Sequence, residues 1–147
     1  MPYASLVIIF NNKRQVLLLK RSAKVDSHPN KWGFPGGRVE EGETSVDAAV
    51  REVYEETTLK VFPKKLTYVF NMKKENGKEI VFFLTDSWHG SVKTDWESDD
   101  YGWFDIAQLP IKDMVPAPKI VFEMIRAWSK MVKPSYPDGP TRSFKQN

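Results

Sequence analysis

Short blocks of apolar residues, separated by polar residues, run through most of the chain. Blocks rich in β-branched and aromatic residues predict strands, because such side chains pack well on a pleated surface. The predicted strands are residues 6–10, 15–20, 66–72, 79–88 and 103–105. Asn76-Gly77 lies between the third and fourth of these strands and is a strong indication of a hairpin. Polar residues 22–31 and 91–100 are expected to form loops.

Two segments instead repeat their apolar residues at the three- and four-residue spacing of a helix face. The first begins near Thr44 or Ser45, where Thr44 and Asp47 have the spacing typical of a helix cap. Its expected buried stripe is Val46, Ala49, Val50 and Val53. The second is expected over residues 118–132, with a core face of Ile120, Val121, Met124, Ile125 and Trp128.

Length and composition indicate a single domain. The 147 residues, 41% of them hydrophobic, predict one compact unit at residues 1–133, followed by a Pro-rich polar tail at residues 134–147. A net charge of +3 is too small to indicate a nucleic-acid polymer as partner. The absence of cysteine excludes disulfides, thiolate metal sites and a cysteine nucleophile.

The start of the chain also limits where the protein is expected to act. It lacks the basic region and long apolar run of a signal peptide or membrane anchor, so we expect a cytoplasmic protein with no membrane partner. The sequence leaves the oligomeric state open, a homodimer included.

The first predicted helix carries three acidic residues on one face. Glu52, Glu55 and Glu56 are three and four positions apart, where like charges repel by roughly 0.2–0.5 kcal/mol per pair. A cation opposite them would remove this repulsion, and oxygen-only ligands favour a hard divalent ion such as Mg²⁺. The alternative is an ordinary acidic helix face in contact with water.

The segment around these residues resembles the signature of the Nudix hydrolases, which cleave a nucleoside diphosphate linked to another group. The positions that fit the signature are Gly37, Glu43, Arg51, Glu52, Val53, Glu55, Glu56 and Leu59. Thr58 stands where the family has a glycine and does not fit. The resemblance extends to residues 32–36 and 103–105 and covers most of residues 3–130.

The resemblance implies an α/β fold of the α+β kind, a Nudix-like α/β/α sandwich with a mixed β-sheet between helices. It also implies Mg²⁺ as cofactor, with Mn²⁺ as a substitute. The implied metal ligands are Glu55 and Glu56, the main-chain carbonyl of Gly36, and Glu52, which is a ligand or the base that deprotonates water. Arg51 is expected to pair with Glu43 and to hold the loop against the helix.

A further carboxylate is expected before Trp103, because many similar proteins carry one there. Asp100 is the first choice and Glu97 the second, with Asp99 nearby, and a solvated acidic loop is the alternative. Among the substrate-binding positions we place Arg21, whose guanidinium suits a phosphate, and Gly37. A surface arginine is the alternative for Arg21.

Thr58 requires a separate expectation. A glycine after a helix commonly adopts the left-handed conformation, which costs other residues roughly 1–2 kcal/mol. We expect the helix to end differently here, at modest cost, without moving Glu55 or Glu56. Thr58→Gly is expected to raise the melting temperature, and unchanged or lower stability would show that the turn is not left-handed.

The resemblance is strongest to the branch that converts nucleoside triphosphates to monophosphates and pyrophosphate. In that branch an Asn before the last helix reads the purine, but Pro118 has no side-chain donor or acceptor. Oxidised guanine is therefore not the expected base. ADP-ribose, nucleotide sugars and dinucleoside polyphosphates are alternative substrates, and a nucleotide sensor without activity is the alternative function.

Overall fold

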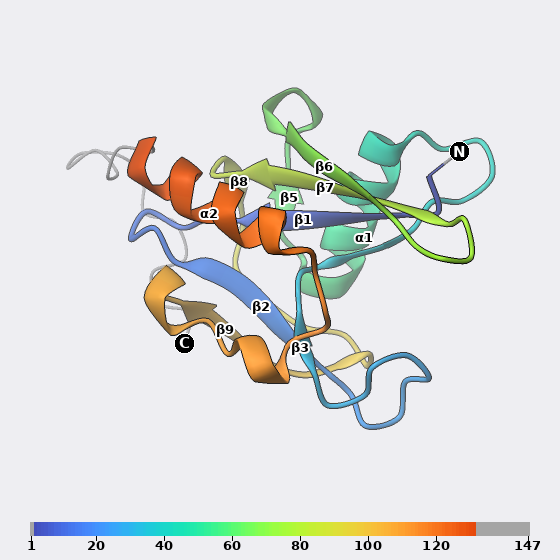
Figure 1. Ribbon diagram of the computed structural model, residues 1–147, viewed down its shortest axis with the longest axis horizontal. Helices are drawn as coiled ribbons and strands as arrows, with labels where there is room; N and C mark the ends of the chain where they lie inside the picture. Colours follow the sequence, from blue (N-terminus) through green and yellow to red (C-terminus); the bar gives the residue numbers. More distant parts are fainter. Residues whose placement is uncertain (1, 132–147) are drawn as a thin grey trace.

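The computed structural model describes residues 2–131. Within this part of the chain, two helices, α1 (Ser45–Thr57) and α2 (Lys119–Met131), accompany nine strands (Figure 1). The strands are β1 (Ala4–Ile9), β2 (Val16–Arg21), β3 (Trp32–Gly33), β4 (Gly36–Arg38), β5 (Lys60–Val61), β6 (Thr67–Lys73), β7 (Glu79–Thr85), β8 (Trp88–His89) and β9 (Ser98–Phe104). Short 3₁₀ turns are η1 (Pro63–Lys65), η2 (Ile106–Gln108) and η3 (Ile111–Asp113). The predicted tail lies outside the described residues.

The strand pairing is mixed, as predicted. β1 runs parallel to β7, with Leu6 opposite Phe82, whereas its other partner, β4, is antiparallel. The pairing divides into three sheets, ordered β4-β1-β7-β6, β3-β2-β9 and β5-β8. The Asn76-Gly77 hairpin joins β6 to β7, and Gly77 has the positive φ of 85° that such a turn favours.

β9 is longer than the sequence predicts. The prediction of a short strand at residues 103–105 after a loop reaching residue 100 was wrong, because β9 begins at Ser98. Its polar first half pairs with β2, where Lys20 lies opposite Asp100 and Leu18 lies opposite Gly102. Pairing with β2, the central strand of its sheet, outweighs the weak strand propensity of these residues.

Two separate cores lie on opposite faces of the strands. In β1, Val7 and Ile9 enter the cluster that includes Val53 of α1, whereas Ile8 enters the cluster that includes Ile125 of α2. This alternation follows from the two-residue period of a strand. Because each cluster is covered by one helix, the strands are sandwiched between α1 and α2 (Figure 1), which confirms the predicted fold class.

The start of α1 and the core face of α2 test the helix predictions. The capping box at Thr44 and Asp47 is formed in full, as predicted. In α2, Val121 and Ile125 are buried as expected, but Phe122 is buried as well and Ile120 is exposed. The prediction for Ile120 was wrong because successive helix residues are about 100° apart, and the buried Val121, Phe122 and Ile125 centre the core face on the side of α2 away from Ile120. Neither described helix is long and apolar enough to cross a membrane.

The end of α1 also differs from expectation. Thr58 has φ 61° and ψ 7°, so the helix ends in the left-handed conformation after all, and its N–H donates to the carbonyl of Tyr54. The expectation of a different ending was wrong because Thr58 adopts the conformation that the family's glycine would adopt. The Thr58 hydroxyl, which has one proton to donate, lies within hydrogen-bond distance of the carbonyl oxygens of Thr57 and Ser91 in this strained conformation.

Candidate active site

Two glycines bring the loop before α1 against both β1 and the helix. Gly36 has φ 144°, and a Cβ there would overlap Ser5 O and lie 2.7 Å from Leu6 Cα. A Cβ on Gly37 would collide with the carboxylate of Glu52. Only residues without a side chain allow this close approach. Gly36 and Gly37, at the start of the Nudix-like segment, are therefore glycines for reasons of space, and Gly37 leaves room for an acidic side chain of α1.

Arg51 connects the loop to the acidic face of α1. Its Nε and Nη2 donate to the two carboxylate oxygens of Glu43 at 2.7 and 3.0 Å, which confirms the predicted pair. Nη1 donates to Glu52 and Glu55 at 3.0 and 3.1 Å, and Nη2 also donates to Arg38 O at 3.0 Å. The hydrogen bond from Arg51 lowers the pKa of Glu43 to about 2. A single guanidinium thus holds three carboxylates and the loop backbone together.

Glu52 and Glu56 are the carboxylates that burial affects most. The oxygen Oε1 of Glu56 accepts a hydrogen bond from the N–H of Gly36 at 3.0 Å. Burial raises the pKa of Glu56 well above its ordinary value, and the negative charges of Glu52 and Glu97 add to the effect. Burial also raises the pKa of Glu52, although Arg51 opposes this. Both groups would be stabilised by an additional cation.

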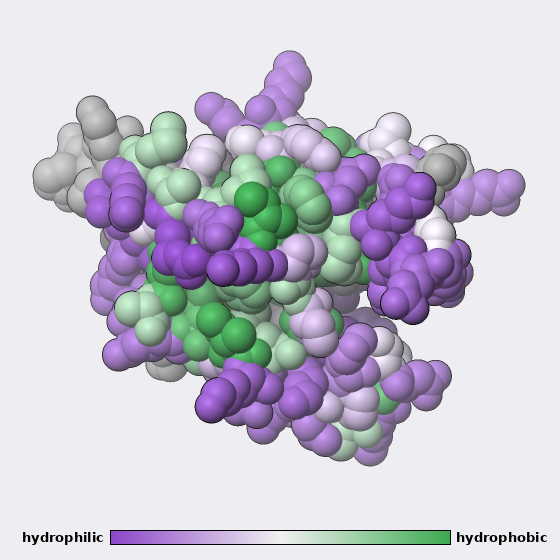
Figure 2. All heavy atoms as spheres, viewed as in Figure 1, coloured by the Kyte–Doolittle hydropathy of each residue, from purple (hydrophilic) through white to green (hydrophobic). Residues whose placement is uncertain are grey.

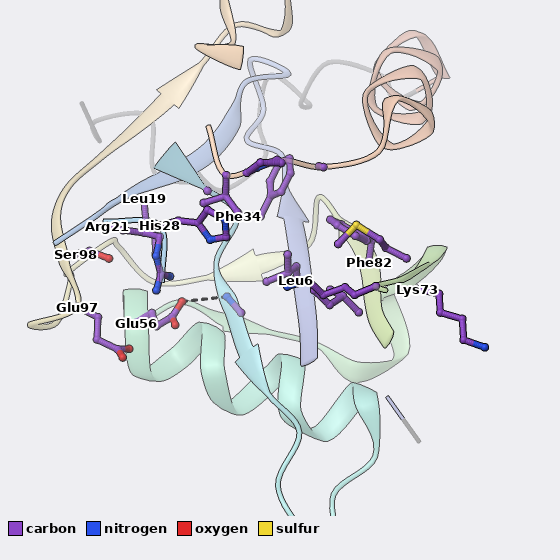
Figure 3. A pocket seen from close by; sticks show the side chains of 18 of the residues that line it. Leu6, Leu19, Arg21, His28, Phe34, Glu56, Lys73, Phe82, Glu97 and Ser98 are labelled. Atoms are coloured by element: carbon purple, nitrogen blue, oxygen red, sulfur yellow. Dashed lines mark hydrogen bonds between the residues drawn. The ribbon is translucent and has the colours of Figure 1, made fainter. Parts of the chain in front are cut away.

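A pocket of about 630 Å³ opens beside this face of the helix. Its acidic end holds Glu56 and Glu97, with Arg21 and His28 next to them (Figure 3). The rest of the wall is mostly apolar, formed by Leu6, Leu19, Phe34, Met72, Ile80, Phe82, Val115, Pro116 and Ala117. Lys73 lies at the far end with its side chain directed away (Figure 3). The molecule is hollowed between the β6–β7 tip and the loop after β2 (Figure 2).

A model of the NUDIX domain matches residues 1–125 of the chain. The chain belongs to the Nudix hydrolase family. This confirms the resemblance found in the sequence, and with it the expectation that the protein is an enzyme.

Individual Nudix proteins are similar over most of the chain. The 8-oxo-dGTP diphosphatase of Escherichia coli is 32% identical over 127 residues, which cover 81% of this chain and 92% of that protein. A putative 8-oxo-dGTP diphosphatase of Bacillus subtilis is 32% identical over 110 residues, 75% of this chain and 70% of that protein. A solved MutT structure, from work on Aliivibrio salmonicida and Vibrio cholerae, has a TM-score of 0.72 at 27% identity, covering 86% of this chain and 97% of the other.

The Nudix signature residues are brought together, but not all of them contact the pocket. Glu56 and Gly36 line it, together with Arg21, which the sequence placed at the substrate. Arg21 Nε donates to the carbonyl of Ser27 at 2.7 Å, so this side chain also holds the loop that carries His28. Arg21 is therefore tied to the pocket wall and is not a free surface arginine.

The structure separates the three acidic residues considered before Trp103. Glu97, the second choice, lines the pocket at the end where Glu56 lies. Asp100, the first choice, lies in β9, where its carboxylate accepts a hydrogen bond from the N–H of Tyr101, and it is not part of the pocket lining. Asp99 is exposed on the same strand. The geometry therefore favours Glu97.

Other pocket residues gave no functional indication in the sequence. Phe34 and Phe82 follow ordinary core patterns, and their rings meet edge to face at 6.3 Å between centroids. His28 resembled a simple loop residue, yet it lines the pocket with a positive φ of 49°. Positive φ outside glycine is uncommon, but it is not visible in a sequence. These residues are recognised only after distant segments have come together.

The family generally uses a divalent metal, and the donor set here fits one. Within residues 2–131, no three acidic or histidine side chains already converge closely enough to hold an ion. Arg51 is the cation that Glu52 and Glu55 contact. The side chain of Glu55 is 53% exposed and so has room to turn away from Arg51. All donors are carboxylate or carbonyl oxygens, which hard divalent cations prefer.

Proposed function

We propose that the protein is a Mg²⁺-dependent pyrophosphohydrolase that converts a nucleoside triphosphate to the monophosphate and pyrophosphate. The observation that carries this proposal is the division of one pocket into two chemically different ends. The buried carboxylate of Glu56 in α1 and the carboxylate of Glu97 lie at one end, and a mostly apolar wall that fits a nucleobase extends from them. A substrate with a charged phosphate chain and a flat base matches both ends.

We assign the residues that hold the ion to Glu56, Glu97 and the carbonyl of Gly36 at the acidic end and to Glu55 on the same helix, with Glu52 as a further ligand or as the base. A Mg²⁺ ion bound there would neutralise phosphate charge and polarise the phosphoryl group, and Mn²⁺ is a substitute. The Arg51–Glu43 pair joins the loop before α1 to the helix and so fixes the positions of these groups, without itself contacting the substrate in this proposal. Their role is therefore to position the ligands.

Proton transfer and phosphate binding fall to neighbouring groups. The raised pKa of Glu52 suits a base that accepts a proton from the attacking water. Arg21 lines the pocket and keeps guanidinium nitrogens for a phosphate oxygen beyond its bond to Ser27. Close packing at Gly37 lets the loop backbone approach the same region.

In this proposal the nucleobase of the substrate is bound by the shape of the pocket and by stacking. The segment of residues 115–117 lines the pocket with apolar side chains, and Pro118 also lacks a side-chain donor or acceptor. Oxidised guanine differs from guanine in its polar edge, which such a wall does not read. Although similar proteins are named for 8-oxo-dGTP, we propose ordinary nucleoside triphosphates as substrates. The reaction uses a free nucleotide in the cytoplasm and needs no membrane or nucleic-acid polymer.

The test is a panel of nucleotides assayed with and without Mg²⁺, with pyrophosphate and phosphate measured separately. The panel holds the common nucleoside triphosphates, 8-oxo-dGTP, ADP-ribose, a nucleotide sugar and a dinucleoside tetraphosphate. We expect pyrophosphate release from triphosphates only when Mg²⁺ is present. Preferred turnover of any other member would replace the proposed substrate, and micromolar binding without turnover of any member would identify a sensor.

Variants of the acidic face test the residue assignment. Glu55→Gln and Glu56→Gln are each expected to lower kcat by at least about 10²-fold, because each removes a charge that holds the ion. Glu123→Gln on exposed α2 makes the same chemical change away from the pocket and is the matched control. More than half of the wild-type activity in both variants would refute the assignment.

A further inference from the structure

Thr58, the one position that departs from the Nudix signature, makes contacts that a glycine cannot make. Its hydroxyl lies 2.7 Å from the carbonyl oxygen of Ser91 and 2.6 Å from that of Thr57. The Thr57 carbonyl also accepts a hydrogen bond from the N–H of Lys93 at 2.8 Å. The carbonyl of Ser91 is therefore the contact through which the hydroxyl reaches another segment, which lies 33 positions further along the chain.

The segment held in this way is the acidic loop, which we define as residues 91–97. At its first end, a Cβ on Gly90 would lie 3.3 Å from the carbonyl oxygen of Thr58, so the chain packs directly against the end of α1. At its other end, the carbonyl of Glu97 accepts a hydrogen bond from the N–H of Ser22 at 2.8 Å. The loop thus spans the distance between the end of α1 and the end of β2.

The acidic loop brings negative charge to the pocket. Glu97 lines the pocket next to Glu56 (Figure 3), and its N–H is held by the carboxylate of Asp95 at 3.1 Å. Glu56 lies in the last full turn of α1, two residues before Thr58. The hydroxyl of Thr58 therefore connects the helix that carries Glu56 to the loop that carries Glu97.

We propose that Thr58 is a positioning residue that fixes the acidic loop, and so Glu97, relative to Glu56. This inference rests on the proposed function of the same pocket. A glycine here would adopt the left-handed conformation without strain but would leave the loop without this tie. The threonine retains the strained conformation and supplies the hydroxyl, which links the two acidic elements of the site.

Three variants separate the hydroxyl from the backbone conformation. Thr58→Ser keeps the hydroxyl, Thr58→Gly removes both hydroxyl and strain, and Thr58→Val keeps the branched shape without the hydroxyl. We expect kcat to stay within about twofold for Ser and to fall about tenfold for Gly and Val, because small displacements of site groups slow catalysis strongly. KM is expected to change less than kcat, since the apolar wall is untouched.

A double-mutant cycle with Glu97→Gln shows whether the effect passes through the loop. If Thr58 acts by placing Glu97, Thr58→Gly should cost little further activity in the Glu97→Gln background. A full tenfold loss in that background, or wild-type kcat in Thr58→Gly and Thr58→Val, would overturn the proposal.

Hydrogen exchange tests the same tie without any activity. The amides of residues 91–97 should exchange faster in Thr58→Gly and Thr58→Val than in wild type and Thr58→Ser. Unchanged exchange would overturn the proposal even if the wild-type protein hydrolyses nucleotides. If the two variants exchange faster but the wild-type protein hydrolyses no nucleotide, the positioning role of Thr58 stands and only the proposed function is refuted.

Discussion

Replacement of Arg51 by Gln should destabilise the protein more than its partly exposed position suggests. The guanidinium donates to three carboxylates and to the carbonyl of Arg38, and its side chain is only 25% exposed. A hydrogen bond to a charged group contributes about 1.5–3 kcal/mol, whereas screened surface pairs contribute about 0–1 kcal/mol. The contact with half-buried Glu52 is of the first kind, and that with exposed Glu55 is of the second.

We therefore expect a loss of about 2 kcal/mol of unfolding free energy. In a domain of this size that corresponds to a fall of about 4–8 °C in Tm. Thermal unfolding of the metal-free protein at neutral pH measures it directly. Arg126→Gln removes the same charge from an exposed position of α2 and serves as control. A Tm for Arg51→Gln within 2 °C of this control would refute the reasoning.

The dependence on pH provides a second check on the same variant. Arg51 lowers the pKa of Glu43 to about 2 from 4.5, so the unfolded chain takes up protons first as the pH falls. The contribution of the pair is complete above pH 4.5 and is lost as the pH falls towards 2. The difference in Tm between wild type and Arg51→Gln should shrink over this range. A constant difference would show that Glu43 is not the partner that matters.

Three further changes test other parts of the site. Glu56→Gln, expected to lower kcat by at least about 10²-fold, should leave Tm equal or higher, because the raised pKa of Glu56 makes the folded state bind its proton more tightly than the unfolded state. The free energy of unfolding of the metal-free wild type should therefore fall as the pH rises above 4.5, and urea unfolding of the variant at several pH values should lack this dependence. Glu97→Gln should lower kcat at least about tenfold and Asp100→Asn less than about twofold, as measured by pyrophosphate release; the reverse order would restore Asp100 as the assisting carboxylate. Thr44→Ala removes the capping box and should cost about 1 kcal/mol, seen as a fall of about 2–4 °C in Tm; an unchanged Tm would show that the cap is not formed in solution.

The sequence was sufficient where local rules determine the structure. The start of α1 follows from Thr44 and Asp47, which are three residues apart and need no other part of the chain. The pairing of Arg51 with Glu43 joins a helix to the loop directly before it, and the resemblance to the Nudix signature already implied it. Residues this close in the sequence have few other partners within reach, so their contacts can be predicted without knowing the rest of the fold.

The sequence was insufficient where distant segments decide. Ser98 to Gly102 contain few strand-forming residues, and only the edge of β2 draws them into β9. In the sequence, Phe34 and Phe82 look like any core aromatic residue, and only the folded structure shows that they also line the pocket. The left-handed Thr58 is likewise held by a carbonyl far along the chain. Such outcomes depend on contacts between segments far apart in the sequence, and a short stretch of sequence carries no information about them.

The division of the interior into two cores has a consequence for how this enzyme can change. The acidic helix rests on one core through Ala49 and Val53, whereas most of the apolar pocket wall, including Phe34 and Phe82, belongs to the other. Mutations that reshape the second core can alter which leaving group or base is accepted while the first keeps the reacting groups in place. Selectivity and chemistry are thus able to diverge separately, which makes the α2 side the place to begin when new substrates are sought by directed evolution.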